Sequence, residues 1–89
     1  MVTEDFKETL KYAEKLNLEG QFYMLIGDFQ KANNMFVKVR AKQEELLPQG
    51  HPKIAYTIQE ECISRLAIGQ IKDVELDLKH ASAIIKEAV

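Results

Sequence analysis

The stretch LIGDFQKA, residues 25–32, reappears in altered form as AIGQIKDV, residues 67–74, at an offset of 42 residues. In both copies a glycine (Gly27, Gly69) follows an aliphatic residue. A large apolar residue comes two positions after the glycine, and a smaller one comes five positions after it. Similarity at a fixed offset is typical of repeat proteins, in which each unit is one supersecondary structure that packs against the next. The sequence therefore predicts two units of the same kind.

Length and composition narrow the class of protein. The 89 residues predict one domain at most, or a piece of one. A net charge of −2 gives no basic surface for nucleic acid or an anionic membrane. The lone Cys62 cannot form an internal disulfide and fits a reducing compartment. MVTEDF, residues 1–6, is acidic and unlike a signal peptide. No apolar run approaches the ~18 residues of a membrane span. We expect a cytoplasmic or nuclear protein without nucleic-acid or membrane partners.

Apolar residues recur every three or four positions, as they do on one face of a helix. Helices are predicted at about 3–26, 28–47, 52–68 and 70–88. The breaks are Gly27, the segment LPQGHP at residues 47–52, and Gly69. The apolar stripes comprise Leu10, Ala13, Leu16, Gly20 and Tyr23; Phe29, Ala32, Phe36 and Val39; Ile54, Ile58 and Cys62; and Ile71, Val74, Leu78, Ala81 and Ile85. No segment alternates with period two, so the prediction is an all-α fold of two antiparallel helical hairpins, about 10–47 and 52–89.

The first unit combines small and aromatic residues in a distinctive order: Leu16, Gly20 and Tyr23 on its first helix, and Phe29, Ala32 and Phe36 on its second. This order resembles the tetratricopeptide repeat (TPR) family. The 42-residue period and HPKIA at residues 51–55 are similar to the repeats of kinesin light chains. The resemblance to the C-terminal helical region of SET/MYND methyltransferases is weaker. The TPR resemblance implies that Gly20 and Ala32 lie where the two helices of a hairpin touch. It also implies that the hairpins stack as a fragment of an α-solenoid.

The second unit departs from this pattern at three positions. Cys62 replaces the small glycine, Arg65 replaces the aromatic residue, and Val74 replaces the small alanine of the second helix. These larger or charged residues predict a hairpin that closes less tightly than the first.

Residues capable of chemistry are few. Cys62, His51 and His80 could suggest a cysteine nucleophile, but such a site needs a thiolate and a base within hydrogen-bonding reach. Cys62 lies on an apolar stripe, where a small packing residue is expected. His51 is expected to brace the turn before Pro52, and His80 to lie on a solvated face. No metal-ligand spacing and no phosphate-binding loop occurs. We therefore expect no catalytic site, no metal and no cofactor.

The TPR resemblance implies a concave groove that is lined by the first helix of each unit and receives a peptide or a partner helix. The implied ligand-binding residues are Asn17, Gln21, Met24, Tyr56, Gln59, Ile63 and Leu66. Amide side chains can bond an extended backbone, and the others offer apolar contact. The alternative is that Met24, Ile63 and Leu66 only face a neighbouring helix. The resulting hypothesis is a protein–protein interaction scaffold, or alternatively an accessory segment of a larger enzyme such as a SET/MYND lysine methyltransferase.

The end of the chain lacks a polar cap. Leu76, Ile84 and Val89 lie off the apolar stripe of the predicted fourth helix. Repeat arrays usually need at least about three units and polar terminal caps. We therefore expect another helix, from a second copy of the chain or from further repeats, to cover Leu76 and Ile84.

Overall fold

The computed structural model describes the backbone of residues 2–88 and the side chains of residues 7–87. It contains four helices: α1 (Val2–Ile26), α2 (Phe29–Leu46), α3 (Pro52–Ala67) and α4 (Val74–Ala88). No strand occurs among residues 2–88, so the predicted all-α class is confirmed. The side chain of Val89, expected to need a cover, lies outside the described residues.

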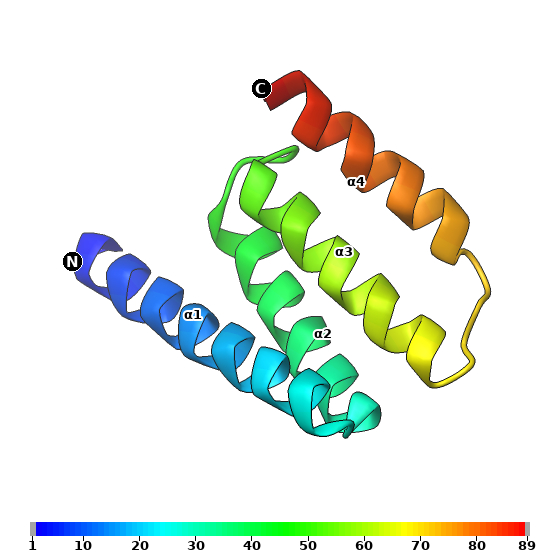
Figure 1. The fold of residues 1–89 in the computed structure, drawn as a ribbon. Helices are drawn as coiled ribbons and strands as arrows, with labels where there is room; N and C mark the ends of the chain where they lie inside the picture. The colour runs from blue at the N-terminus through cyan, green and yellow to red at the C-terminus, as the bar shows by residue number, and fades with distance from the viewer. Residues whose placement is uncertain (1, 89) are drawn as a thin grey trace.

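The helices form an open, antiparallel array rather than a closed bundle. Each helix packs against its neighbour in the sequence, α1 on α2, α2 on α3 and α3 on α4 (Figure 1). Helices α1 and α4 are the two edges of this array. The array measures 43 × 30 × 20 Å. Both edge helices consequently have a face that no other helix of the chain covers.

The first hairpin turn shows why the repeated sequence contains a glycine. Gly27 has a φ of 83°, a conformation that strains residues with a Cβ. The Asp28 N–H donates to the Tyr23 carbonyl at 2.9 Å, and the Gly27 N–H donates to the Met24 carbonyl at 3.2 Å. This pair of bonds is the Schellman motif, which ends a helix and satisfies its last carbonyls.

The second hairpin turn repeats this geometry at the 42-residue offset. Gly69 also has a φ of 83°. The Gln70 N–H donates to the Arg65 carbonyl at 2.8 Å, and the Gly69 N–H donates to the Leu66 carbonyl at 3.1 Å. The same backbone bonds therefore end α1 and α3, as the repeated sequence predicts.

After the turn the two units diverge, because only the first has a good helix cap. The Asp28 carboxylate accepts a hydrogen bond from the Lys31 N–H at 3.3 Å, which allows α2 to start at once. Gln70 is the equivalent residue, and its longer side chain is not a preferred N-cap. Helix α4 begins at Val74, whereas the prediction placed its start at about 70.

The late start of α4 corrects one predicted core residue. The chain continues past Gln70 to Asp73, which has a φ of 61° and whose carbonyl accepts the Asp77 N–H at 3.0 Å. Ile71 consequently lies in the connection and is 72% exposed, so its assignment to the apolar stripe of α4 was wrong.

The other predicted stripes form the core. The positions buried in both units are Ala13 and Ala55, Leu16 and Ile58, Gly20 and Cys62, Ala32 and Val74, and Val39 and Ala81. One apolar cluster lies between α1 and α2, and a second lies between α3 and α4. Each hairpin thus contains its own apolar core.

The contact between α1 and α2 requires glycine at position 20, as expected. A Cβ added to Gly20 would lie 2.7 Å from Cε1 of Phe36. The ring of Phe36 is fully buried and cannot easily withdraw. Ala32, the other predicted small residue, is fully buried as well.

The second hairpin uses different contacts. Cys62 is fully buried in the core between α3 and α4. The Arg65 guanidinium donates to Asp77 Oδ2 at 3.0 Å and to the Lys72 carbonyl. Arg65 therefore ties the end of α3 to both the connection and α4, at the position where Tyr23 lies in the first unit.

The interface between the two hairpins, α2 against α3, contains a polar layer. Ser64 Oγ donates to Asn33 Oδ1 at 3.1 Å, and the Arg40 guanidinium donates to Glu61 Oε2 at 3.1 Å. This layer was not predicted from the sequence. Asn33 is buried, but its equivalent in α4, Glu75, is exposed. The difference arises because α2 has neighbours on two sides and α4 has only one.

The two residues expected to need a cover at the end of the array differ. Leu76 is 68% exposed on α4, in agreement with the expectation. Ile84 instead packs against the apolar core between α3 and α4 and is partly buried. The expectation for Ile84 was wrong, because α4 turns this residue toward α3.

Candidate functional site

A groove opens where α1 and α3 approach each other across α2. Its lining is drawn from all three helices and comprises Glu14, Asn17, Gln21, Gln43, Lys53, Tyr56, Thr57 and Glu60. The hollow has a volume of about 390 Å³. α1 and α3 supply the walls, and Gln43 is the contribution of α2. We call this hollow the α1–α3 groove.

Two amide side chains of the α1–α3 groove have unsatisfied oxygens. Asn17 Oδ1 and Gln43 Oε1 are both buried and have no hydrogen-bond partner among the described residues. A buried acceptor without a partner costs about 1–3 kcal/mol of stability. Gln43 is only 9% exposed as a whole residue. The groove therefore contains hydrogen-bonding capacity that the chain itself does not use.

The rim of the groove is charged and accessible. Lys53 Nζ lies 3.8 Å from Glu14 Oε1, which links α3 to α1 across the groove. Their side chains are 59% and 70% exposed, respectively. Ion pairs this exposed contribute little to stability, because water and salt screen them. The link can consequently open at low cost.

The structure brings together three of the seven residues that the sequence singled out. Asn17, Gln21 and Tyr56 line the α1–α3 groove. Met24 and Gln59 are partly buried and do not contribute to its lining.

The remaining two predicted residues lie further along α3. Ile63 and Leu66 are 49% and 46% exposed, respectively. Neither lines the α1–α3 groove, and both their predicted binding role and the alternative of facing a neighbouring helix stay predictions. They extend the face of α3 beyond the groove.

Sequence reasoning missed Gln43, which the structure places in the groove. Gln43 follows the buried Val39 by four residues and therefore lies on the inward side of α2. A glutamine within the apolar stripe of a helix indicates a polar group on its inward side, so the sequence did contain a signal for Gln43. Glu14, Lys53, Thr57 and Glu60 had no such signal, because their place depends on how α1 and α3 converge.

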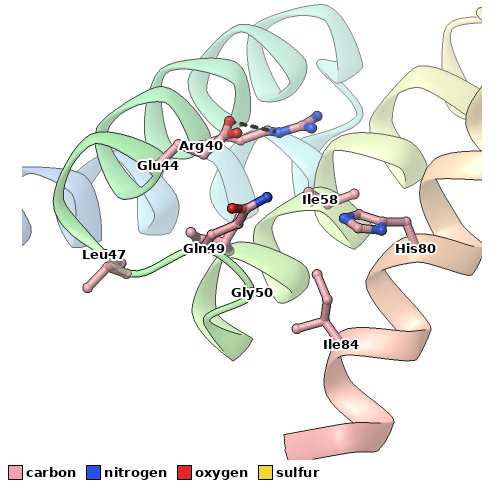
Figure 2. Close-up of a pocket in the computed structure, with 9 residues that line it drawn as sticks. Arg40, Glu44, Leu47, Gln49, Gly50, Ile58, His80 and Ile84 are labelled. Carbon is pink, nitrogen blue, oxygen red and sulfur yellow. Dashed lines mark hydrogen bonds and ion pairs between the residues drawn. The ribbon is translucent and has the colours of Figure 1, made fainter.

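A second hollow lies between α2, α3 and α4, with a volume of about 340 Å³ (Figure 2). His80 and Ile84 from α4 face Leu47, Gln49 and Gly50 from the end of α2 and the connection that follows it. Ile54 and Ile58 from α3, together with Arg40 and Glu44 from α2, complete its lining.

The cation of this second hollow is already engaged. Arg40 forms ion pairs with Glu44 at 3.2 Å and with Glu61 at 3.1 Å. Burial by itself would lower the pKa of Arg40, but the Glu61 hydrogen bond and the nearby carboxylates outweigh it and raise the pKa. The guanidinium is thus a permanent, internally neutralised charge with little attraction left for a ligand.

The residues that could suggest nucleophilic chemistry have structural roles. Cys62 is fully buried, and burial raises the pKa of its thiol, which disfavours the reactive thiolate. His51 Nδ1 accepts the Lys53 N–H at 3.1 Å and caps α3, as expected for a residue that braces the turn. His80 is exposed, also as expected.

Within the described part of the chain, no cluster of three metal-ligating side chains occurs. Likewise, none of the helices described combines the length and apolar character needed to cross a membrane. Comparison with family models, curated proteins and solved structures yields no match for this chain.

Proposed function

We propose that the chain is a TPR-like protein-interaction module whose α1–α3 groove binds an extended peptide segment of a partner protein. The observation that carries the proposal is the pair of buried, unpaired oxygens on Asn17 and Gln43. An extended peptide displays backbone N–H groups, which are the donors that these oxygens lack. Bonds to such a peptide would recover part of the free energy that the unpaired oxygens cost.

The other groups of the groove support the same assignment. Tyr56 is 53% exposed on the wall and offers a large, rigid contact surface. Gln21 is exposed opposite and can both donate and accept hydrogen bonds. The exposed ion pair between Lys53 and Glu14 would open to admit the peptide. A reducing compartment, cytoplasmic or nuclear, belongs to this proposal because Cys62 is a free thiol.

Selection of random peptides displayed against the 89-residue chain tests the proposal. Selected peptides are then titrated against the wild-type chain, Tyr56→Ala and Tyr12→Ala. Tyr12 is the matched control, since it is 50% exposed on α1 and does not line the groove. We expect Tyr56→Ala to weaken binding by about tenfold or more, the usual effect of truncating a central aromatic contact. Tyr12→Ala should leave the affinity unchanged.

Two results would overturn the proposal. Failure of the selection to enrich any peptide would argue against peptide binding by this chain. Equal affinities for the wild type and Tyr56→Ala would place the binding surface outside the α1–α3 groove.

A further inference from the structure

The buried atoms that the α1–α3 groove leaves without a partner are both hydrogen-bond acceptors. They are Asn17 Oδ1 and Gln43 Oε1, whereas no buried side-chain nitrogen among the described residues is left unpaired. The buried hydroxyl of Thr57 adds no donor, because it already donates to the Lys53 carbonyl at 3.0 Å. A ligand that satisfies this groove therefore has to bring more donors than acceptors.

The charge of the groove is negative at one end. Its charged lining residues are Glu14, Lys53 and Glu60, so two carboxylates stand against one ammonium group. Lys53 and Glu14 pair with each other across the groove at 3.8 Å. Glu60 follows Lys53 by seven residues, about two turns further along α3, and takes part in none of the ion pairs among the described residues. Glu60 is thus the uncompensated charge of the groove.

None of the cations in the described part of the chain compensates Glu60. Residues 17–26 of α1, which include the wall opposite, contain no lysine or arginine. Three cations of α2 and α3 are already paired with other carboxylates: Arg40 with Glu61, Lys42 with Glu45, and Arg65 with Asp77. Further lysines of α1 and α2 are exposed and do not line the groove: Lys11, Lys15 and Lys38. A cation that meets Glu60 has to come from the ligand.

The side chain next to Glu60 on α3 is aromatic. Tyr56 precedes Glu60 by four residues, so the two side chains are neighbours on one face of the helix. Tyr56 is 53% exposed, which leaves its ring open to a ligand. A guanidinium stacks on such a ring and can direct its N–H groups at acceptors beside it. It has five donors and no acceptor, so it complements a carboxylate and unpaired oxygens.

We infer that the peptide bound by the α1–α3 groove carries an arginine, whose guanidinium stacks on Tyr56 and pairs with Glu60. The inference rests on the proposed function and names the kind of peptide that the groove selects. The guanidinium and the peptide backbone together supply the donors that Asn17 and Gln43 lack. Lysine fits less well, because its ammonium group is a compact point charge without a planar face to stack. An acidic side chain would be repelled by Glu60.

The sequences of the peptides selected by display against the 89-residue chain give the first test. Peptides that require Tyr56 for binding should share an arginine. One such peptide and its arginine-to-glutamine version are then titrated against the wild-type chain, Glu60→Gln and Glu87→Gln. Glu87→Gln is the matched control, since it changes the net charge equally and Glu87 is exposed on α4, at the opposite edge of the array.

The expected result is a coupled loss of affinity. Glu60→Gln should weaken binding of the arginine peptide by about tenfold, the usual effect of losing a hydrogen bond to a charged group. Glu87→Gln should leave the affinity unchanged. The glutamine version of the peptide should bind the wild-type chain about tenfold more weakly, and Glu60→Gln should weaken it no further, because the contact is already lost. Both protein variants should keep wild-type helicity by circular dichroism.

The possible failures separate this inference from the proposed function. Peptides that require Tyr56 but share no arginine, or share an acidic residue instead, would overturn the inference and leave peptide binding by the groove intact. Equal effects of Glu60→Gln and Glu87→Gln would overturn it too, because the net charge alone would then account for the loss. A selection that enriches no peptide would overturn the proposed function, and this inference with it.

Discussion

Ser64 Oγ lies 3.1 Å from Asn33 Oδ1 and joins α3 to α2 at a point that water does not reach. Ser64 is fully buried and Asn33 is 9% exposed. The same hydroxyl lies 2.7 Å from the Glu61 carbonyl, so its single proton is shared between two acceptors. The two hairpins are therefore held together by a directional contact between specific residues, in addition to apolar packing.

This contact predicts a measurable coupling. Ser64→Ala should lower the free energy of unfolding by about 1–3 kcal/mol, because it leaves a buried amide without its partner. Asn33→Ala should have a similar effect. The double variant should lose less than the sum of the two, since the unpaired group is then gone. Urea denaturation of the four proteins measures this, and strictly additive losses would show that the two side chains act independently.

The Gly20–Phe36 contact predicts a reversal of normal helix propensity. Alanine normally stabilises a helix interior relative to glycine by about 0.5–1 kcal/mol. At position 20 the added Cβ would meet the buried Phe36 ring at 2.7 Å, and overpacking of this kind costs about 1–3 kcal/mol. Gly20→Ala should therefore lower the melting temperature, and adding Phe36→Leu should relieve part of that loss.

Ser82→Ala is the control for this prediction, because Ser82 is exposed in α4 and meets no such ring. It should be neutral or slightly stabilising. A higher melting temperature for Gly20→Ala would contradict the assigned hairpin contact.

The repeat itself supplies a matched test of helix capping. Asp28→Ala removes the carboxylate that caps α2 and should cost about 1 kcal/mol. Gln70→Ala alters the equivalent residue of the second turn, where α4 does not begin, and should leave stability unchanged. Thermal unfolding of both variants measures the difference. Equal effects would mean that the Asp28 carboxylate does not cap α2.

Cys62 should make the free energy of unfolding depend on pH in the alkaline range. Burial raises the pKa of its thiol, so the folded state holds the proton more tightly than the unfolded state does. The stabilisation that comes from this protonated thiol is fully present below the ordinary thiol pKa of about 8.5. It is lost as the pH rises through the higher pKa of the folded state. The stability difference between the wild type and Cys62→Ala should therefore be constant at neutral pH and shrink above it.

The reactivity of Cys62 gives an independent measurement. A thiol reagent such as Ellman's reagent should label it in native buffer only as fast as the protein unfolds, and at once in denaturant. Rapid labelling of the native chain would contradict its burial between α3 and α4.

Gln43 should show opposite effects on stability and binding. Gln43→Met keeps a similar side-chain volume and removes a buried oxygen without a partner, so the free energy of unfolding should rise by about 1 kcal/mol. The same change should weaken binding of a selected peptide, if that oxygen accepts a peptide N–H. Chemical denaturation and peptide titration measure the two effects. Increased stability with unchanged affinity would show that Gln43 takes no part in binding.

The helices, the hairpin turns and most of the apolar core follow from local features of the sequence. These features depend on local rules, namely a period of three to four residues, glycine where φ is positive, and a small residue where helices touch. The identical bonds at Gly27 and Gly69 follow from such rules. The delayed start of α4 could also be explained locally, because Gln70 caps a helix poorly.

Which flanks of the helices are covered and which stay open depends instead on how the helices pack against one another. Asn33 and Glu75 occupy equivalent positions, yet one is buried and the other exposed, because α2 lies between two helices and α4 is at an edge. Gln43 became part of the groove because α1 and α3 converge over α2, and Ile84 became covered because α4 turns it toward α3. Periodicity identifies the inward face of a helix, whereas the directions of its neighbours set the limits of that face.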